Sequence, residues 1–141
     1  MPNKPKVTLI VGLPGSGKTH LAESLGRISN CYRPTIVVDD PIYENMPAIE
    51  EAIKTGKSLI ITDPHFCVTK TRNDAKTQLE TWGAEVEMTF FENNPEACLV
   101  NVKFRDDGRA VESFIKILSS LYEPPTEVWK CKIWQPGDDP R

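Results

Sequence analysis

The stretch Gly12-Leu13-Pro14-Gly15-Ser16-Gly17-Lys18-Thr19 matches the pattern G-x-x-x-x-G-K-[ST] at every fixed position. Its glycines let successive backbone N–H groups approach phosphate oxygens without a Cβ in the way. Lys18 adds a mobile positive charge, and Thr19 offers a hydroxyl to a Mg²⁺ ion that bridges two phosphates. A helix that begins here also directs its positive end at the same anion. The stretch therefore predicts a binding site for nucleotide phosphates.

The segments on both sides of this stretch have the strand and helix patterns that such a loop requires. A continuous apolar run at residues 7–11 is typical of a buried strand. Residues 20–28 carry Leu21, Leu25 and Ile28 at helical spacing. We interpret the motif as a P-loop (Walker A) and expect ATP to contact a set of loop and first-turn residues, namely Gly12, Pro14, Gly15, Ser16, Gly17, Lys18, Thr19 and His20.

Composition limits the chain to one ordinary globular domain. With 141 residues it can bury a core but has no room for a second one. The 17 basic and 20 acidic residues give a formal charge of −3, which argues against a generally basic nucleic-acid surface but allows a local one. The four cysteines are scattered singly, so neither a zinc site nor a disulfide framework is predicted. Without a signal peptide or a membrane-length apolar run, we expect a cytoplasmic protein.

The remaining chain alternates between strand and helix patterns. This alternation predicts an α/β fold, a small kinase-type P-loop three-layer sandwich with a mainly parallel sheet and right-handed crossovers. We expect a single domain over residues 1–141, with a helical lid at about 94–110 and a tail at about 124–141. The predicted strands are 7–11, 35–38, 58–62 and 85–91, with a possible edge strand in 127–134, and the predicted helices are 20–28, 46–55, 70–82, 95–105 and a last one closing at 121.

Other landmarks narrow the class of P-loop protein. No N-K-x-D sequence follows an apolar strand, which argues against a GTPase. The third strand ends on a single acid followed by proline, unlike the paired acids expected in a large ATPase. Kinases acting on small molecules or nucleic acids are therefore favoured. A non-catalytic nucleotide-binding module or slow ATPase is the alternative, and an acceptor-side base separates the two because only a kinase needs one.

Acidic side chains end two predicted strands, where ligands of parallel sheets bind. Asp39 and Asp40 follow the second strand, and either could take the proton of an acceptor hydroxyl or cap a turn. Asp63 follows the third strand, where it could hold Mg²⁺ together with Thr19, directly or through water, or close a proline turn.

Basic and aromatic residues supply further candidates. Arg105 and Arg109 flank a Gly-containing break, and one of them could swing onto the transferring phosphoryl group. His65 and Arg72 could contact the acceptor, while solvated surface positions are the alternative for the arginines. The three tryptophans, Trp82, Trp129 and Trp134, are interpreted as packing residues rather than base-stacking platforms. The basic residues available to hold a DNA backbone are Arg72, Lys76, Lys116, Lys130 and Lys132.

With these residues placed, the chain resembles the phage P-loop DNA kinases, which comprise the kinase domain of phage polynucleotide kinases and the phage kinases of 5-hydroxymethyluracil in DNA. The matching landmarks are the P-loop, Asp39-Asp40, Thr62-Asp63, and the run from Phe91 through Asn101 and Arg105 to Arg109. The resemblance implies that Asp39 is the general base and that Arg105 or Arg109 is the lid arginine. It also implies ATP and Mg²⁺ as cofactors and DNA with a modified pyrimidine as partner. The implied acceptor is the 5-hydroxymethyl group of hydroxymethyluracil in DNA, with a 5′-OH polynucleotide or a nucleoside or nucleotide as alternatives.

Overall fold

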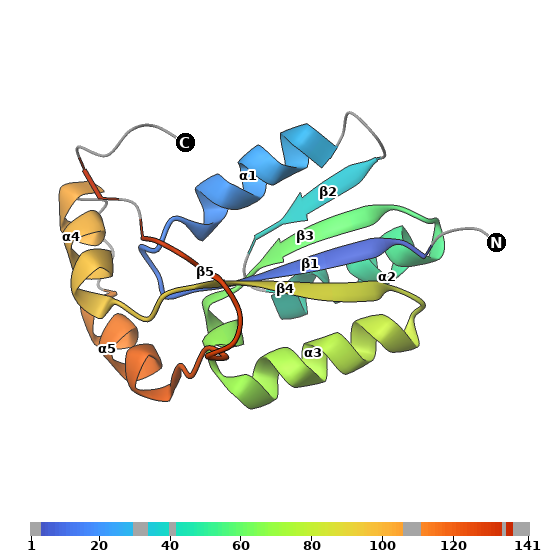
Figure 1. Cartoon of the computed structure of the whole chain (residues 1–141). Helices are drawn as coiled ribbons and strands as arrows, with labels where there is room; N and C mark the ends of the chain where they lie inside the picture. The colour runs from blue at the N-terminus through green and yellow to red at the C-terminus, as the bar shows by residue number, and fades with distance from the viewer. Residues whose placement is uncertain (1–3, 30–33, 40–41, 106–110, 134, 137–141) are drawn as a thin grey trace.

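A computed structural model describes residues 4–29, 34–39, 42–105, 111–133 and 135–136 of the chain. Its centre is a five-stranded parallel sheet with strand order β2-β3-β1-β4-β5 (Figure 1). The strands are β1 Lys6–Val11, β2 Thr35–Val38, β3 Ser58–Thr62, β4 Glu85–Phe91 and β5 Lys130–Cys131. The helices are α1 Lys18–Ser29, α2 Met46–Lys54, α3 Thr69–Thr81, α4 Pro95–Arg105 and α5 Glu112–Leu121, with short 3₁₀ turns η1 Ile42–Asn45 and η2 Pro64–Cys67.

The strand order places the helices in two unequal layers. The connection from β1 through α1 leads to β2 at one edge of the sheet. The connections from β2 to β3, from β3 to β4 and from β4 to β5 all run in the opposite direction across the sheet. Because parallel crossovers are right-handed, α1 covers one face and α2 and α3 cover the opposite face (Figure 1). The helix α1 packs on β3, β2 and β1, and α3 packs on β4. The three-layer α/β sandwich expected from the sequence is confirmed.

The middle strands β1 and β3 are apolar because helices cover both of their faces. Residues Val7, Leu9, Ile10 and Val11 of β1 are fully buried, as a central parallel strand requires. β1 pairs directly with β3 in the register Val7↔Leu59 to Ile10↔Thr62. The carboxyl ends of both strands therefore meet at one edge, so the P-loop after β1 lies beside the residues that follow β3.

The element boundaries agree closely with those expected from the sequence, with a few informative differences. The first helix begins at Lys18, so the lysine of the P-loop is itself the first helical residue. The edge strand exists but has only two residues, Lys130 and Cys131, which pair in parallel with Phe90 and Phe91 of β4. No helix within the described residues combines the length and apolarity needed to cross a membrane.

Candidate nucleotide-binding site

The P-loop adopts a backbone that only glycine fits at its centre. Gly15 and Gly17 have φ angles of 84° and 98°, in the region that side chains disfavour. A Cβ at Gly15 would also lie 2.7 Å from the carbonyl oxygen of Cys98 in α4. The glycine pattern recognised in the sequence therefore has two causes, the turn itself and the close approach of α4.

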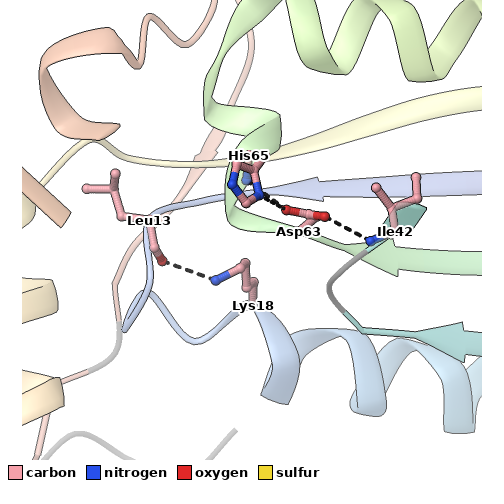
Figure 2. Close-up of polar contacts among 5 residues, drawn as sticks. All are labelled: Leu13, Lys18, Ile42, Asp63 and His65. Carbon is pink, nitrogen blue, oxygen red and sulfur yellow. Dashed lines mark hydrogen bonds and ion pairs between the residues drawn. The ribbon is translucent and has the colours of Figure 1, made fainter. Parts of the chain in front are cut away.

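Two polar groups of the loop fit a bound phosphate. Lys18 is only 8 % exposed, and its Nζ donates a hydrogen bond of 3.4 Å to the carbonyl oxygen of Leu13, so the ammonium lies across the loop (Figure 2). The buried hydroxyl of Ser16 has no hydrogen-bond partner within the described residues. A buried polar atom without a partner is costly, and a phosphate oxygen would satisfy it. The loop residues thus suit the phosphates of ATP.

A cavity of about 220 Å³ opens onto the P-loop and joins four parts of the chain. The loop and first turn of α1 supply one wall, and Arg105 at the end of α4 lines the same space. Arg109 and Asp40 lie outside the described residues. The full lining is Pro14, Gly15, Gly17, Lys18, Thr19, His20, Pro64, Arg105, Val111 and Phe114. Sequence reasoning missed Pro64, Val111 and Phe114, because their apolar character indicates core packing.

Asp63 is enclosed by hydrogen bonds rather than open to solvent. One carboxylate oxygen accepts the backbone N–H of His65 at 2.8 Å and contacts the ring Nδ1 of His65 at the same distance. The other oxygen accepts the backbone N–H of Ile42 at 3.0 Å (Figure 2). Asp63 is fully buried and caps η2. An acid with these partners suits a Mg²⁺ contact through water better than direct coordination.

Asp39 has the opposite environment. It is exposed at the end of β2, and one of its carboxylate oxygens accepts a 2.7 Å hydrogen bond from the hydroxyl of Thr62 at the end of β3. The Thr62 side chain is buried, so it fixes the direction of a carboxylate that still faces solvent. Thr62 was not singled out as a site residue in the sequence, because the contact depends on β2 pairing with β3.

His65 lies beside the cavity. Its side chain is 55 % exposed, and its ring centroid is 5.5 Å from that of Phe114, which lines the cavity. An ionised Asp63 can only accept hydrogen bonds, so the contact between them requires the His65 proton on Nδ1. The Nε2 atom is then the ring nitrogen left for a ligand.

The expectation that Arg72 contacts an acceptor is wrong. Arg72 is 5 % exposed on the buried side of α3, and its guanidinium donates to the carbonyl oxygens of Phe66, Cys67 and Glu123. It also lies 5.3 Å above the centre of the Phe90 ring. Its charge is used to join η2 and the segment after α5 to the sheet, so it is not available to a substrate phosphate.

A hydrogen-bonded chain fastens α4 to the P-loop. The side-chain amide of Asn101, 7 % exposed, donates a 2.9 Å hydrogen bond to the carbonyl oxygen of Gly15. Gln135 donates in turn to Asn101 at 3.3 Å and to the carbonyl oxygen of Ala97 at 3.0 Å. Arg105 is one helical turn beyond Asn101, so this contact sets the position of the arginine relative to the loop.

Two buried thiols lie within the electrostatic reach of Lys18. Burial raises the pKa of Cys67 from 9.0 to about 12, and burial raises that of Cys98 to about 12, with the positive charge of Lys18 opposing both shifts. Both thiols therefore stay protonated at neutral pH. Such cysteines are packing residues rather than nucleophiles.

Comparison with known proteins extends these observations. The chain is 35 % identical over 107 residues to "Uncharacterized protein R277" of Acanthamoeba polyphaga mimivirus. The aligned residues cover 74 % of this chain and 75 % of the viral protein. The chain belongs to the same family as this viral protein. No family model matches the chain.

Solved structures share the fold at low sequence identity. A gluconokinase from Sinorhizobium meliloti 1021 superposes with a TM-score of 0.56 and 16 % identity, covering 95 % of this chain and 86 % of that one. A structure described as APE1195 superposes with a TM-score of 0.63 and 19 % identity, covering 88 % and 82 %. At these identities the likeness shows the fold alone, an α/β sandwich that this chain shares with both solved structures.

Proposed function

We propose that the protein is an ATP-dependent phosphotransferase that moves the γ-phosphate to a hydroxyl on DNA, most readily the 5-hydroxymethyl group of hydroxymethyluracil. The observation that supports phosphate transfer is the cavity, because both Lys18 of the P-loop and Arg105 of a different helix, α4, line it. A module that only binds nucleotide does not need an arginine from a second element facing the phosphates, whereas phosphoryl transfer needs that charge.

Each residue of the proposed site has a separate role in the phosphate transfer. The P-loop N–H groups, Ser16 and Lys18 bind the phosphates, and Arg105 stabilises negative charge on the transferring group. The acceptor oxygen forms a bond to the γ-phosphorus as the bond to the ADP oxygen breaks, and the hydroxyl proton passes to Asp39. Bound Mg²⁺ would neutralise phosphate charge, with Thr19 as a ligand and Asp63 acting through water.

The open surroundings of Asp39 and His65 are the reason for proposing a polymer as the acceptor. Within the described residues, β2 and β3 are connected only by η1 and α2, and Ile42, Ile49 and Ile53 of this connection pack into the core. Among the residues that the structure describes, no inserted helical segment covers Asp39 and His65, and both are exposed. A base on DNA can enter an open site after rotating out of the stack, at a cost of a few kcal/mol. DNA with a free 5′-OH end is the second candidate acceptor.

The test is phosphate transfer from γ-labelled ATP in the presence of Mg²⁺. The acceptors are DNA containing 5-hydroxymethyluracil, unmodified DNA with 5′-OH ends, and the free hydroxymethylated nucleoside. We expect the modified DNA to be labelled fastest and the label to disappear in Lys18→Met, which keeps side-chain length and removes the charge. Preference for the free nucleoside would contradict the DNA acceptor. Hydrolysis of ATP with no labelled acceptor would favour a slow ATPase instead.

A further inference from the structure

The base proposed for the transfer follows the least enclosed long strand of the sheet. β2 is an edge strand, and its four residues are exposed or only partly buried. Asp39 comes directly after this strand and is exposed. An exposed carboxylate samples several rotamers unless a contact holds it. A general base has to be held within hydrogen-bond reach of the proton that it takes, so Asp39 needs a contact that orients it.

Thr62 supplies such a contact from a rigid part of the sheet. It ends β3, which lies between β2 and β1 and whose five residues are all buried. Thr62 itself is 1 % exposed. The register pairs Val38 of β2 with Ile61 of β3, so Asp39 and Thr62 are the next residues along the two strands. Neighbouring residues of paired parallel strands point to the same face, which brings these two side chains together.

The hydrogen bond between the two side chains has a defined direction. An ionised carboxylate only accepts, so the Thr62 hydroxyl donates to Oδ1 of Asp39, at 2.7 Å. A β-branched side chain in a buried strand has few χ1 choices, so the donor is itself fixed. The orientation of the exposed carboxylate is therefore set by a buried residue of the neighbouring strand.

We infer that Thr62 is a positioning residue for phosphate transfer, which holds Oδ1 of Asp39 so that Oδ2 takes the proton of the acceptor hydroxyl. The proton moves to Oδ2 as the acceptor oxygen bonds to the γ-phosphorus and the bond to the ADP oxygen breaks. The proton of the Thr62 hydroxyl stays on Thr62. The inference rests on the proposed function, because that function makes Asp39 the base.

A purely structural role for Thr62 would be to fasten β2 to β3. The backbones of residues 35–38 and 58–61 already pair in parallel register, and Asp39 lies beyond the last pair. A hydrogen bond to an exposed carboxylate adds little to this pairing, because water competes for the same oxygen. The structural role and the positioning role predict different results for a valine and a serine at position 62.

The experiment compares Thr62→Val, which removes the hydroxyl and keeps the β-branched shape, with Thr62→Ser, which keeps the hydroxyl. Transfer from γ-labelled ATP to DNA containing 5-hydroxymethyluracil gives kcat and KM, and urea unfolding gives the stability. We expect kcat to fall roughly ten- to hundredfold in Thr62→Val, with the dissociation constant for ATP unchanged. Thr62→Ser should keep most of the wild-type kcat although it is the less stable variant, because it loses a buried methyl group.

A double-mutant cycle separates an effect through Asp39 from an effect on the whole site. In the Asp39→Asn background, Thr62→Val should change kcat by less than about twofold, since no base is left to be positioned. The matched control is Thr8→Val. Thr8 is buried in β1, and its hydroxyl donates a 3.0 Å hydrogen bond to the carboxylate of Glu87 on β4. Its loss removes the same kind of contact between neighbouring strands and should leave kcat unchanged.

Several outcomes would overturn the inference. Wild-type kcat in Thr62→Val is one, and an equal loss of kcat in Thr8→Val is another. Additive effects of Thr62→Val and Asp39→Asn would show that Thr62 acts through a different group. Thr62→Ser keeps the test decisive if Thr62→Val is unstable, because loss of activity with the hydroxyl present contradicts a positioning role.

The same assay separates this inference from the proposed function. Wild-type transfer that does not depend on the Thr62 hydroxyl removes only the positioning role. Absence of transfer from the wild-type protein to every acceptor tested removes the proposed function, and the role of Thr62 with it.

Discussion

Asp39 and Asp63 follow neighbouring strands, yet their surroundings suit them to different tasks. Asp63 is fully buried and its oxygens accept hydrogen bonds from His65 and Ile42. Asp39 is exposed, and its carboxylate accepts a hydrogen bond from the Thr62 hydroxyl. A general base must reach the proton of the acceptor hydroxyl, and of these two acids Asp39 is the one that is exposed. These surroundings therefore favour Asp39 over Asp63 as the base that takes the proton of the acceptor hydroxyl.

We predict that Asp39→Asn lowers the rate of phosphate transfer about 10²- to 10⁴-fold and leaves the affinity for ATP unchanged, because it removes a base outside the nucleotide cavity. Rates come from label transfer, and affinity comes from titration calorimetry. Asp74→Asn is the matched control, since Asp74 is an exposed acid on α3 that pairs with Lys70. Wild-type turnover in Asp39→Asn would remove the general base from the proposed mechanism.

At the scale of elements, α4 is tied to the P-loop by Asn101. We predict that Asn101→Leu raises the dissociation constant for ATP and lowers the transfer rate, each roughly two- to tenfold, because one buried hydrogen bond contributes about 0.5–1.5 kcal/mol. Calorimetry and steady-state rates measure the two effects. Asn73→Leu, an exposed position on α3, should change neither. Equal behaviour of the two variants would show that the contact with Gly15 does not position Arg105.

The helix α3 provides a second prediction at this scale. Arg72→Lys should lower the free energy of unfolding by about 2 kcal/mol, because a lysine cannot reproduce the fork that donates to three carbonyl groups. Urea unfolding measures the loss. Lys76→Met, on the exposed side of α3, should stay within about 0.5 kcal/mol of wild type. A raised KM for the acceptor in Arg72→Lys, with unchanged stability, would restore Arg72 to the acceptor site.

At the scale of the whole molecule, the buried thiols make stability depend on alkaline pH. Cys67 and Cys98 ionise near pH 9 when unfolded and near 12 when folded, so between these values the unfolded chain binds fewer protons. Stability must therefore fall as pH rises, and it is unaffected by these thiols well below pH 9. We predict a loss on the order of 1 kcal/mol per thiol for each pH unit in this window.

Urea unfolding of the reduced protein at pH 8, 9, 10 and 11 tests this dependence. The variant Cys67→Ala/Cys98→Ala should be less stable at pH 8 but should show a shallower decline. The comparison uses slopes rather than absolute stabilities, because removing a buried sulfur also leaves a cavity. Parallel curves for the two proteins would show that other groups cause the decline.

The sequence alone determined the elements and the phosphate-binding loop. Helical and strand periodicities are local, so the bounds of β2, β3 and β4 could be read directly from residues 35–38, 58–62 and 85–91. The glycine pattern, Lys18 and Thr19 are likewise contiguous. The alternation of elements then limited the topology to a parallel sheet, which already placed Asp39 and Asp63 at one edge.

Only the tertiary structure decided what each polar side chain contacts. Arg72 and Lys76 are equivalent in a polar helix pattern, yet one packs under η2 and the other faces solvent. The hydrogen bond from Ile42 to Asp63 spans 21 positions, and that from Asn101 to Gly15 spans 86. Trp129 is exposed beside β5, where none of the described helices that connect two strands covers the α1 side of the sheet. These outcomes depend on how distant segments pack, and neither composition nor periodicity encodes that packing.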